Sequence, residues 1–446
     1  MSTSSMVSVC HHRFTRLLPW LLLLAAAALT HAHAQHVAVG PWSGGVTSDA
    51  ASIVARLYTP RFSTLEVSDD PDFAHFVSFG ESSPRPGDQP EMSRFRAVGL
   101  KPLTRYHYRI RIGSQHDGQR RGSFMTMPLE GKPTSFRFAL SAGATTGSAH
   151  GVYSEIKSQA PMFFVVAGNL FDTAIGASDR AAFRAAYEEV LMSPNQADLY
   201  RTVPIVYTWD AYDYGAGGGA VPARAAAHAS FREYVPHFGL VDPGSPDGTI
   251  NRAFTIGRVR FLVLDVRTER GPPGTTLLGE RQLAWFKAEL LAAKDRHPLV
   301  FVVSPSSWLS PAAAGRDDWG RYAAERDALS DWIAENGIKG LCFLGGDGSV
   351  LAADDGTNNR YGQHKAPGFP VLQAGPLDRG HGTGTGPWTH GPITPEGGEG
   401  FFAMIDVTDA EGRISVSFRG LNQHGQERLK FSFQVPAPVN VAGTIP

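Results

Sequence analysis

Cysteine is nearly absent from this chain of 446 residues, which contains only Cys10 and Cys342. Cys10 lies in an N-terminal segment that has the features of a signal peptide, so we expect one cysteine in the exported protein. An internal disulfide is therefore excluded, and stability must come from packing. Cys342 lies in the apolar run at 340–344, which predicts a buried, unreactive thiol rather than a nucleophile or a metal ligand.

Long hydrophobic runs are absent after the first 34 residues. Two arginines precede an apolar stretch at 17–29 that is too short to span a bilayer, and Ala-His-Ala at 32–34 has the pattern of a cleavage site. We therefore expect residues 1–34 to be a signal peptide that is cleaved before Gln35. Because no later stretch could form a membrane helix, we expect a periplasmic or secreted protein.

The chain also lacks an excess of charge of either sign, since 41 Lys and Arg residues oppose 42 Asp and Glu residues. This balance gives no argument for a nucleic-acid-binding patch or for attachment to an anionic membrane. The length is that of at least two domains. The sequence leaves the oligomeric state open.

Alternating polar and apolar residues predict a small all-β domain at 35–128. Runs such as 51–58 and 106–112 alternate in this way, and clusters of Gly, Pro, Ser and Asp separate them. The stretch at 99–108 is similar to the tyrosine corner of fibronectin type III-like sandwiches, in which a tyrosine hydroxyl binds the preceding turn. We therefore predict a fibronectin type III-like β-sandwich.

The pattern changes to that of an α/β domain at 129–436, where short apolar runs alternate with longer amphipathic segments. The predicted strands are 136–140, 162–167, 204–207, 259–264, 299–303 and 338–344, with a closing antiparallel pair at 400–407 and 413–420. The predicted helices are 180–191, 225–234, 280–293 and 323–336. Residues 437–446 are expected to form a flexible C-terminal tail.

Gly, Ser, Asp or Asn follows nearly every predicted strand, and α/β sheets bind ligands at these carboxyl ends. The stretch W-D-A-Y-D-Y-G-A-G-G-G at 209–219 carries two aspartates, but neither histidine nor asparagine. Asp347 follows another strand and lies between two glycines, and the Gly-rich stretch at 375–400 predicts a long surface loop near the site. Asp265 and Arg267, at a further strand end, are expected to pair with each other.

The order of these motifs resembles that of the PhoD-like (alkaline phosphatase D-type) metallophosphatases, over essentially the whole chain after residue 34. The motifs are S-F-R-F-A-L-S-A-G-A at 135–144, G-N-L-F at 168–171, W-D-A-Y-D-Y-G at 209–215, L-D-V-R at 264–267 and G-D-G-S at 346–349. The resemblance implies an exported phosphoesterase that acts on a phosphoester or another small molecule. It also implies a metallophosphoesterase-type α/β sandwich of mixed sheets flanked by helices, preceded by the small β-sandwich.

Four ligand positions of the family carry other residues in this chain. Gly143 stands where the family has a metal-binding cysteine, and Asn169 stands where it has an aspartate that bridges two metals. Tyr212 stands at a histidine of the third loop, and Ser349 at the histidine of the last motif. The resemblance therefore implies a site that has lost its bridging anion, its thiolate and a nitrogen ligand.

Metal ions about 3.5–4 Å apart repel each other and need a bridging anion, which the neutral amide of Asn169 does not supply. We therefore interpret the dinuclear site as degenerate and expect weak or no phosphoesterase activity, as in a pseudoenzyme or a ligand-binding protein. We assign no catalytic residue. Arg267 is a possible supporting residue of such a site.

Two alternatives remain open. Asp210, Asp213 and Asp347 are retained and could hold a Ca, Fe, Mn or Zn ion with a recruited loop histidine, such as His150 or His381, in a divergent but active phosphoesterase. The histidines show no ligand spacing, so we expect them to be solvated. Alternatively, the sandwich at 35–128 is the part of the protein that binds a partner.

Overall fold

The computed structural model describes residues 37–58, 63–81, 92–176, 178–215, 221–243, 245, 248–313, 317–346, 349–380 and 386–437. The predicted signal peptide and all of the predicted tail except Ala437 lie outside these residues. No helix within the described ranges is long and apolar enough to cross a membrane.

The described part of the N-terminal region contains strands and no helix. These strands are β1 (Val37–Gly44), β2 (Ala50–Leu57), β3 (Ser63–Ser68), β4 (Val77–Phe79), β5 (Met92–Val98), β6 (Arg105–Ile112), β7 (Gln115–His116) and β8 (Gly122–Met125). The hydroxyl of Tyr106 accepts the backbone N–H of Lys101 at 3.0 Å. This hydrogen bond confirms the contact that the tyrosine-corner pattern predicted.

The rest of the chain alternates strands and helices. Its helices are α2 (Gly151–Ser158), α3 (Arg180–Met192), α4 (Pro194–Thr202), α5 (Ala211–Tyr214), α6 (Val221–Tyr234), α7 (Gly279–Ala293) and α8 (Ala323–Glu335), with a short 3₁₀ turn η1 (Trp319–Tyr322). Its strands are β9 (Phe136–Ser141), β10 (Phe164–Ala167), β11 (Ile205–Thr208), β12 (Arg252–Ile256), β13 (Val259–Val263), β14 (Leu299–Val303), β15 (Leu341–Gly345), β16 (Leu351–Asp354), β17 (Val371–Gln373), β18 (His390–Ile393), β19 (Phe401–Ala410), β20 (Arg413–Asn422) and β21 (Glu427–Pro436).

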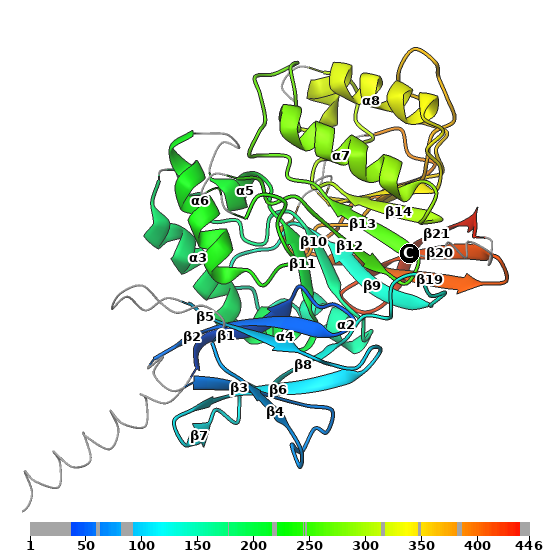
Figure 1. The fold of residues 1–446 in the computed structure, drawn as a ribbon. Coiled ribbons are helices and arrows are strands. Elements are labelled where there is room, and N and C mark those ends of the chain that lie inside the picture. The colour runs from blue at the N-terminus through cyan, green and yellow to red at the C-terminus, as the bar shows by residue number, and fades with distance from the viewer. Residues whose placement is uncertain are drawn as a thin grey trace, which may run out of the picture.

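Two mixed sheets form the centre of the molecule (Figure 1). One sheet has nine strands, in the order β21-β20-β19-β9-β10-β11-β1-β2-β5, and the other has seven, in the order β12-β13-β14-β15-β17-β16-β18. Their facing sides bury a phenylalanine-rich core, in which the ring of Phe138 lies 5.6 Å from the rings of both Phe261 and Phe301. The fold is thus the predicted α/β sandwich of mixed sheets.

Helices cover the outer face of each sheet. Residues of α2, α3, α4 and α6 pack on the nine-stranded sheet, and residues of α7 and α8 pack on the seven-stranded sheet (Figure 1). Four of these helices, α3, α6, α7 and α8, were predicted from the sequence to within a few residues. Cys342 is fully buried in β15, and burial raises the pKa of its thiol well above the ordinary value.

The N-terminal region shares the larger sheet. Strands β1, β2 and β5 extend the nine-stranded sheet through a parallel bridge between Gly44 and Ile205, while β3, β4, β6, β7 and β8 form a separate sheet. A Cβ at Gly44 would lie 2.4 Å from the carbonyl oxygen of Pro236. Only glycine therefore allows the backbone of β1 to approach this closely.

The loops that follow the parallel strands of both sheets lie along one edge of the sheets, at the carboxyl ends of the strands. Strands β9, β10 and β11 are parallel, as are β13, β14, β15 and β17. The two sets meet where the hydroxyl of Thr208, at the end of β11, donates to the carbonyl of Leu264, just after β13, at 2.7 Å. The crevice therefore lies at the strand ends, as the sequence predicted.

Candidate functional site

A cavity of about 230 Å³ lies at this edge of the sheets. Its lining residues come from the loops after β9, β10, β11, β15 and β17, and they are Gly143, Asn169, Ala211, Tyr212, Gly346, Ser349, Arg379 and Gly380. The structure thus brings together the four positions at which the sequence departs from the PhoD-like pattern. The chemistry of the cavity depends on which side chains these loops carry and on which of those side chains are already bonded to other protein groups.

Asp213 holds two of the loops together. Its carboxylate accepts the backbone N–H of Asn169 at 2.6 Å, that of Asp210 at 3.0 Å and that of Phe171 at 3.4 Å. Burial raises the pKa of Asp213 to about 7, although these N–H donors act in the opposite direction. Both oxygens are therefore engaged by the backbone, and the side chain connects the loop after β10 to the loop after β11.

Asp210 is the N-cap residue of α5 and forms a fully buried ion pair. The Nε of Arg267 donates to its Oδ1 at 2.6 Å, and a second guanidinium nitrogen also contacts that oxygen. Arg267 contacts Asp317 as well, at 2.7 Å. The charge of Asp210 is thus compensated by a protein cation, and among the described residues its Oδ2 has no hydrogen-bond partner.

The predicted pair of Asp265 and Arg267 is made through the backbone N–H of Arg267. Asp265 accepts the N–H of Arg267 at 3.0 Å, while it also accepts the indole N–H of Trp209 at 2.8 Å and the N–H of Ile250 at 3.0 Å. The guanidinium of Arg267 pairs instead with Asp210 and with Asp317. Asp265 and Arg267 are therefore paired, as predicted, through the backbone N–H of Arg267 rather than through its guanidinium.

Asn169 lines the cavity in a left-handed backbone conformation, with a φ of 53°. Its Oδ1 accepts the N–H of Tyr212 at 3.2 Å, so the amide oxygen is bonded to the protein. Tyr212 in turn lies beneath Arg379, whose guanidinium carbon is 3.7 Å from the centre of the tyrosine ring. This distance is that of a close cation–π contact.

The other predicted site residues contribute less. Ser349 lines the cavity with a φ of 49°, whereas Asp347 and His381 lie outside the described residues. His150 is the N-cap of α2, and its Nδ1 accepts the N–H of Val152 at 3.2 Å. It therefore has a structural role and is not one of the residues that line the cavity.

These residues do not fit a dinuclear metal centre. Gly143 offers no side chain, Asn169 has its oxygen on a backbone amide, and Asp210 and Asp213 are engaged by Arg267 and by backbone N–H groups. No group of three or more His, Cys, Asp or Glu side chains in the described ranges is placed to hold a metal ion. Among the described residues, two cations at this edge would find neither a set of ligands nor a bridging anion.

Arg379 is the main residue that the sequence reasoning missed. It lies in the stretch G-P-L-D-R-G at 375–380, inside the Gly-rich segment that was predicted as a loop near the site. The sequence feature that could have indicated Arg379 is that it is a single arginine in a loop rich in glycine. It could not be weighted more strongly because nothing in the sequence showed that Tyr212 would lie beside it.

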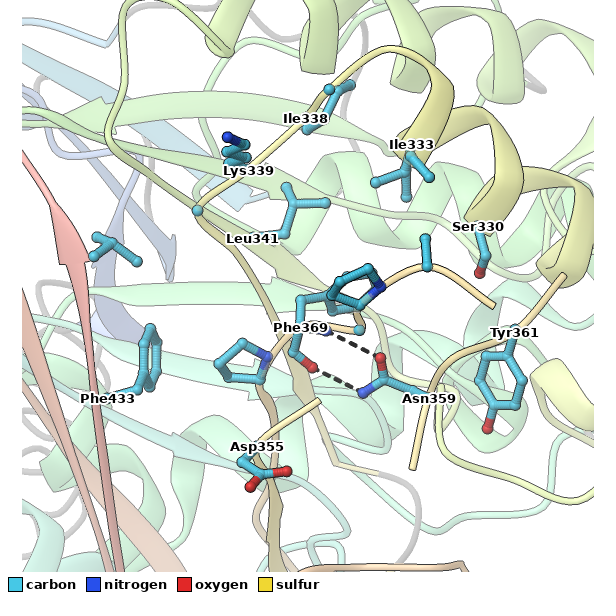
Figure 2. Close-up of a pocket in the computed structure, with 18 of the residues that line it drawn as sticks. Ser330, Ile333, Ile338, Lys339, Leu341, Asp355, Asn359, Tyr361, Phe369 and Phe433 are labelled. Atoms are coloured by element: carbon cyan, nitrogen blue, oxygen red, sulfur yellow. Dashed lines mark hydrogen bonds between the residues drawn. The ribbon is translucent and has the colours of Figure 1, made fainter. Parts of the chain in front are cut away.

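A second, larger cavity of about 590 Å³ lies between the end of α8, the loop at 359–370 and β21 (Figure 2). Its lining is mainly apolar and includes Ile333, Leu341, Phe369 and Phe433. The polar Asn359 is bonded to both backbone groups of Phe369, as the dashed lines in Figure 2 show. This cavity carries none of the predicted site residues.

Comparison with known proteins agrees with this architecture. Residues 166–381 match the family model described as PhoD-like phosphatase, whereas no curated protein matches the chain. A solved structure of PhoD is similar with a TM-score of 0.67 and 16% sequence identity, covering 89% of this chain and 90% of that one. The purple acid phosphatase PPD1 from seeds of yellow lupin (Lupinus luteus) is similar with a TM-score of 0.60 and 12% identity, covering 90% of this chain and 74% of that one. The structural likenesses show the fold, and the matched family model shows that residues 166–381 are similar to PhoD-like phosphatases.

Proposed function

We propose that this protein is an exported member of the PhoD-like family that binds a small ligand in the strand-end cavity and has little or no phosphoesterase activity. The observation that carries the proposal is the state of the two aspartates at 210 and 213. Asp210 is paired with Arg267, and Asp213 accepts three backbone N–H groups. Asp213 cannot bind a metal ion without breaking contacts that hold the site together, and among the described residues Asp210 has only its Oδ2 without a partner.

The retained cavity supports a binding role. Its volume of about 230 Å³ is below the roughly 300–1,000 Å³ of pockets for drug-sized ligands. The lining includes neutral polar side chains, a tyrosine ring and one arginine. A small polar molecule suits this combination better than an apolar one does.

Metal content and turnover test the proposal. We expect the purified protein to contain well under one metal ion per chain by elemental analysis, and to hydrolyse bis(p-nitrophenyl) phosphate no faster than the buffer does. An active metallophosphatase assayed in parallel shows that the conditions support turnover. A tightly bound stoichiometric metal together with ordinary turnover would contradict the proposal.

The same measurements decide the alternative of a rebuilt single-metal site. That site would use the Oδ2 of Asp210, which has no partner among the described residues, and would recruit Asp347 with a loop histidine. If it exists, Asp347→Ala abolishes hydrolysis and a chelator removes it reversibly. On our proposal neither treatment changes the rate.

Export is supported by the basic, apolar and small-residue segments within positions 1–34. We expect the N-terminal peptide of the mature protein, determined by mass spectrometry, to begin at Gln35. Recovery of the uncleaved chain from the cytoplasm would contradict export.

A further inference from the structure

The loop that carries Arg379 is fixed to the loop after β9. The backbone N–H of Leu377 donates to Ala142 at 2.8 Å, and that of Arg379 donates to Gly143 at 3.4 Å. The carboxylate of Asp378 accepts the N–H of Thr145 at 2.7 Å. Arg379 therefore lies on a constrained backbone, although it belongs to a Gly-rich stretch.

The guanidinium of Arg379 is then held over the cavity by Tyr212. The guanidinium carbon lies over the ring, 3.7 Å from its centre, so the cation is held against the aromatic face. In the described part of the chain no carboxylate pairs with Arg379. The neighbouring carboxylates have other partners, since Asp210 pairs with Arg267 and Asp378 binds Thr145.

Neutral donors also lie beside this cation. Asn169 lines the cavity and has its Oδ1 bonded to Tyr212, which leaves its amide N–H groups as donors. Ser349 lines the cavity with a hydroxyl. The described lining thus contains one positive charge, the neutral donors of Asn169, Ser349 and Tyr212, and no carboxylate, which is an environment that selects an anion.

We infer that the cavity is a metal-independent site for an oxyanion, namely a phosphate group, in which Arg379 provides the positive charge. This inference rests on the proposed function, because it requires the cavity to be free of metal ions. The planar guanidinium binds two oxygens of a phosphate in parallel. The phosphate group can belong to inorganic phosphate or to a small phosphomonoester, and the volume of about 230 Å³ limits the ester to a small substituent.

Calorimetric titration of the protein in a chelator tests the inference, with inorganic phosphate and phenyl phosphate as probes. We expect saturable binding of at least one probe at one site per chain. Arg379→Ala should weaken it roughly 10- to 100-fold, the size of effect for a hydrogen bond to a charged group. Tighter binding of phenyl phosphate would identify an ester headgroup, and equal binding would identify the free ion.

Three further variants separate the role of Arg379 from a general loss of structure. Arg379→Lys keeps the positive charge but lacks the planar guanidinium group that binds two oxygens, so we expect an intermediate affinity. Tyr212→Phe keeps the stacking ring and should retain binding, whereas Tyr212→Leu should weaken it. Arg296→Ala removes an exposed arginine at the opposite ends of the strands, before β14, and should bind as the wild type does. Thermal unfolding confirms that each variant is folded.

Metal content and turnover, measured on the same sample, distinguish a failure of this inference from a failure of the proposed function. A metal-free, inactive protein that binds neither probe would overturn this inference and leave the proposed function standing. Unchanged affinity in Arg379→Ala would overturn it as well. Binding that requires an added divalent cation, or a tightly metal-loaded and active protein, would overturn the proposed function instead.

Discussion

The buried pair of Asp210 and Arg267 has the largest expected effect of any single contact at the site. Both side chains are fully buried, so removing one leaves the other charged group without its partner in a region of low polarity. We expect Arg267→Met to lower the free energy of unfolding by about 3–5 kcal/mol. Equilibrium unfolding in guanidinium chloride measures this change.

The control for this prediction is Arg413→Met, since Arg413 pairs with Glu411 on the surface. Exposed pairs contribute at most about 1 kcal/mol. The double variant Asp210→Asn, Arg267→Met should cost less than the sum of the single variants, because it removes both charges of the pair. If Arg267→Met is no more destabilising than Arg413→Met, the pair does not hold the site together.

Because His237 is buried in its neutral form, we predict that the protein loses stability in mild acid. Burial, aided by the nearby Arg94, lowers the pKa of His237 to about 4, and the ring stacks on Phe231 while Nδ1 bonds to the carbonyl of Phe238. The unfolded chain therefore takes up a proton near pH 6.5, whereas the folded chain does so only near pH 4. The contribution of neutral His237 to the free energy of unfolding is complete above pH 6.5 and is lost as the pH falls toward 4.

Comparison with His237→Phe isolates this effect, because other titrating groups are common to both proteins. We expect the melting temperature of the wild type to fall relative to that of the variant between pH 6.5 and 4, and the difference to level off below pH 4. A difference that does not change across this range would show that the folded His237 is protonated as easily as the unfolded one.

At the residue scale, the sequence predicted which positions meet at the site but not how they are bonded. Gly143, Asn169, Tyr212 and Ser349 line one cavity, as their strand-end positions indicated. The partners of Asp210 and Asp213 could not be predicted, because they are set by the packing of loops that are far apart in sequence. Arg379 was missed for the same reason.

At the scale of elements, the loop after β9 has a glycine, Gly143, where it contacts the loop that carries Arg379. Gly143 has a φ of 70°, and its carbonyl accepts the N–H of Arg379 at 3.4 Å. A Cβ at this position would lie 3.4 Å from that of Pro376. The backbone conformation, more than the space, therefore requires glycine here.

Gly143→Ala should consequently lower the free energy of unfolding by about 1–2 kcal/mol, the cost of a left-handed conformation for a residue with a Cβ. Gly118→Ala is the matched control, because Gly118 is exposed and lacks a positive φ, and a Cβ there would have no neighbour within 4 Å. Denaturant unfolding compares the two. Equal stability of both variants would mean that the loop after β9 can relax without loss.

Elements with strong periodicity were the most predictable part of the fold. The run at 299–303 became β14 at the predicted bounds, and the amphipathic segment at 280–293 became α7 at Gly279–Ala293. Short or irregular elements were not predicted, including α2, α4 and the strands β16 to β18. Their sequences carry too few apolar repeats, and α4 begins with a proline directly after α3 ends.

At the scale of the whole molecule, the N-terminal strands are coupled to the α/β core by more than chain connectivity. The indole of Trp42 donates to the carbonyl of Tyr234 at 2.8 Å, and Arg94 donates to that of Val235 at 3.0 Å. The hydroxyl of Tyr108 donates to the carbonyl of Arg201 at 2.9 Å. The sequence predicted a separate all-β segment but could not show these contacts, since each joins residues far apart in the chain.

The coupling predicts a single unfolding transition for the N-terminal strands and the α/β core. Gly44→Ala should destabilise both together by about 1–3 kcal/mol, because a Cβ there would lie 2.4 Å from the carbonyl oxygen of Pro236 and 2.8 Å from that of Ile205, at the bridge between β1 and β11. Gly80→Ala is the control, since a Cβ at Gly80 would have no neighbour within 4 Å. Circular dichroism and tryptophan fluorescence should give coincident curves for the wild type and both variants, with only Gly44→Ala shifted. Two separate transitions, of which Gly44→Ala moves only one, would show instead that the N-terminal strands fold as an independent unit.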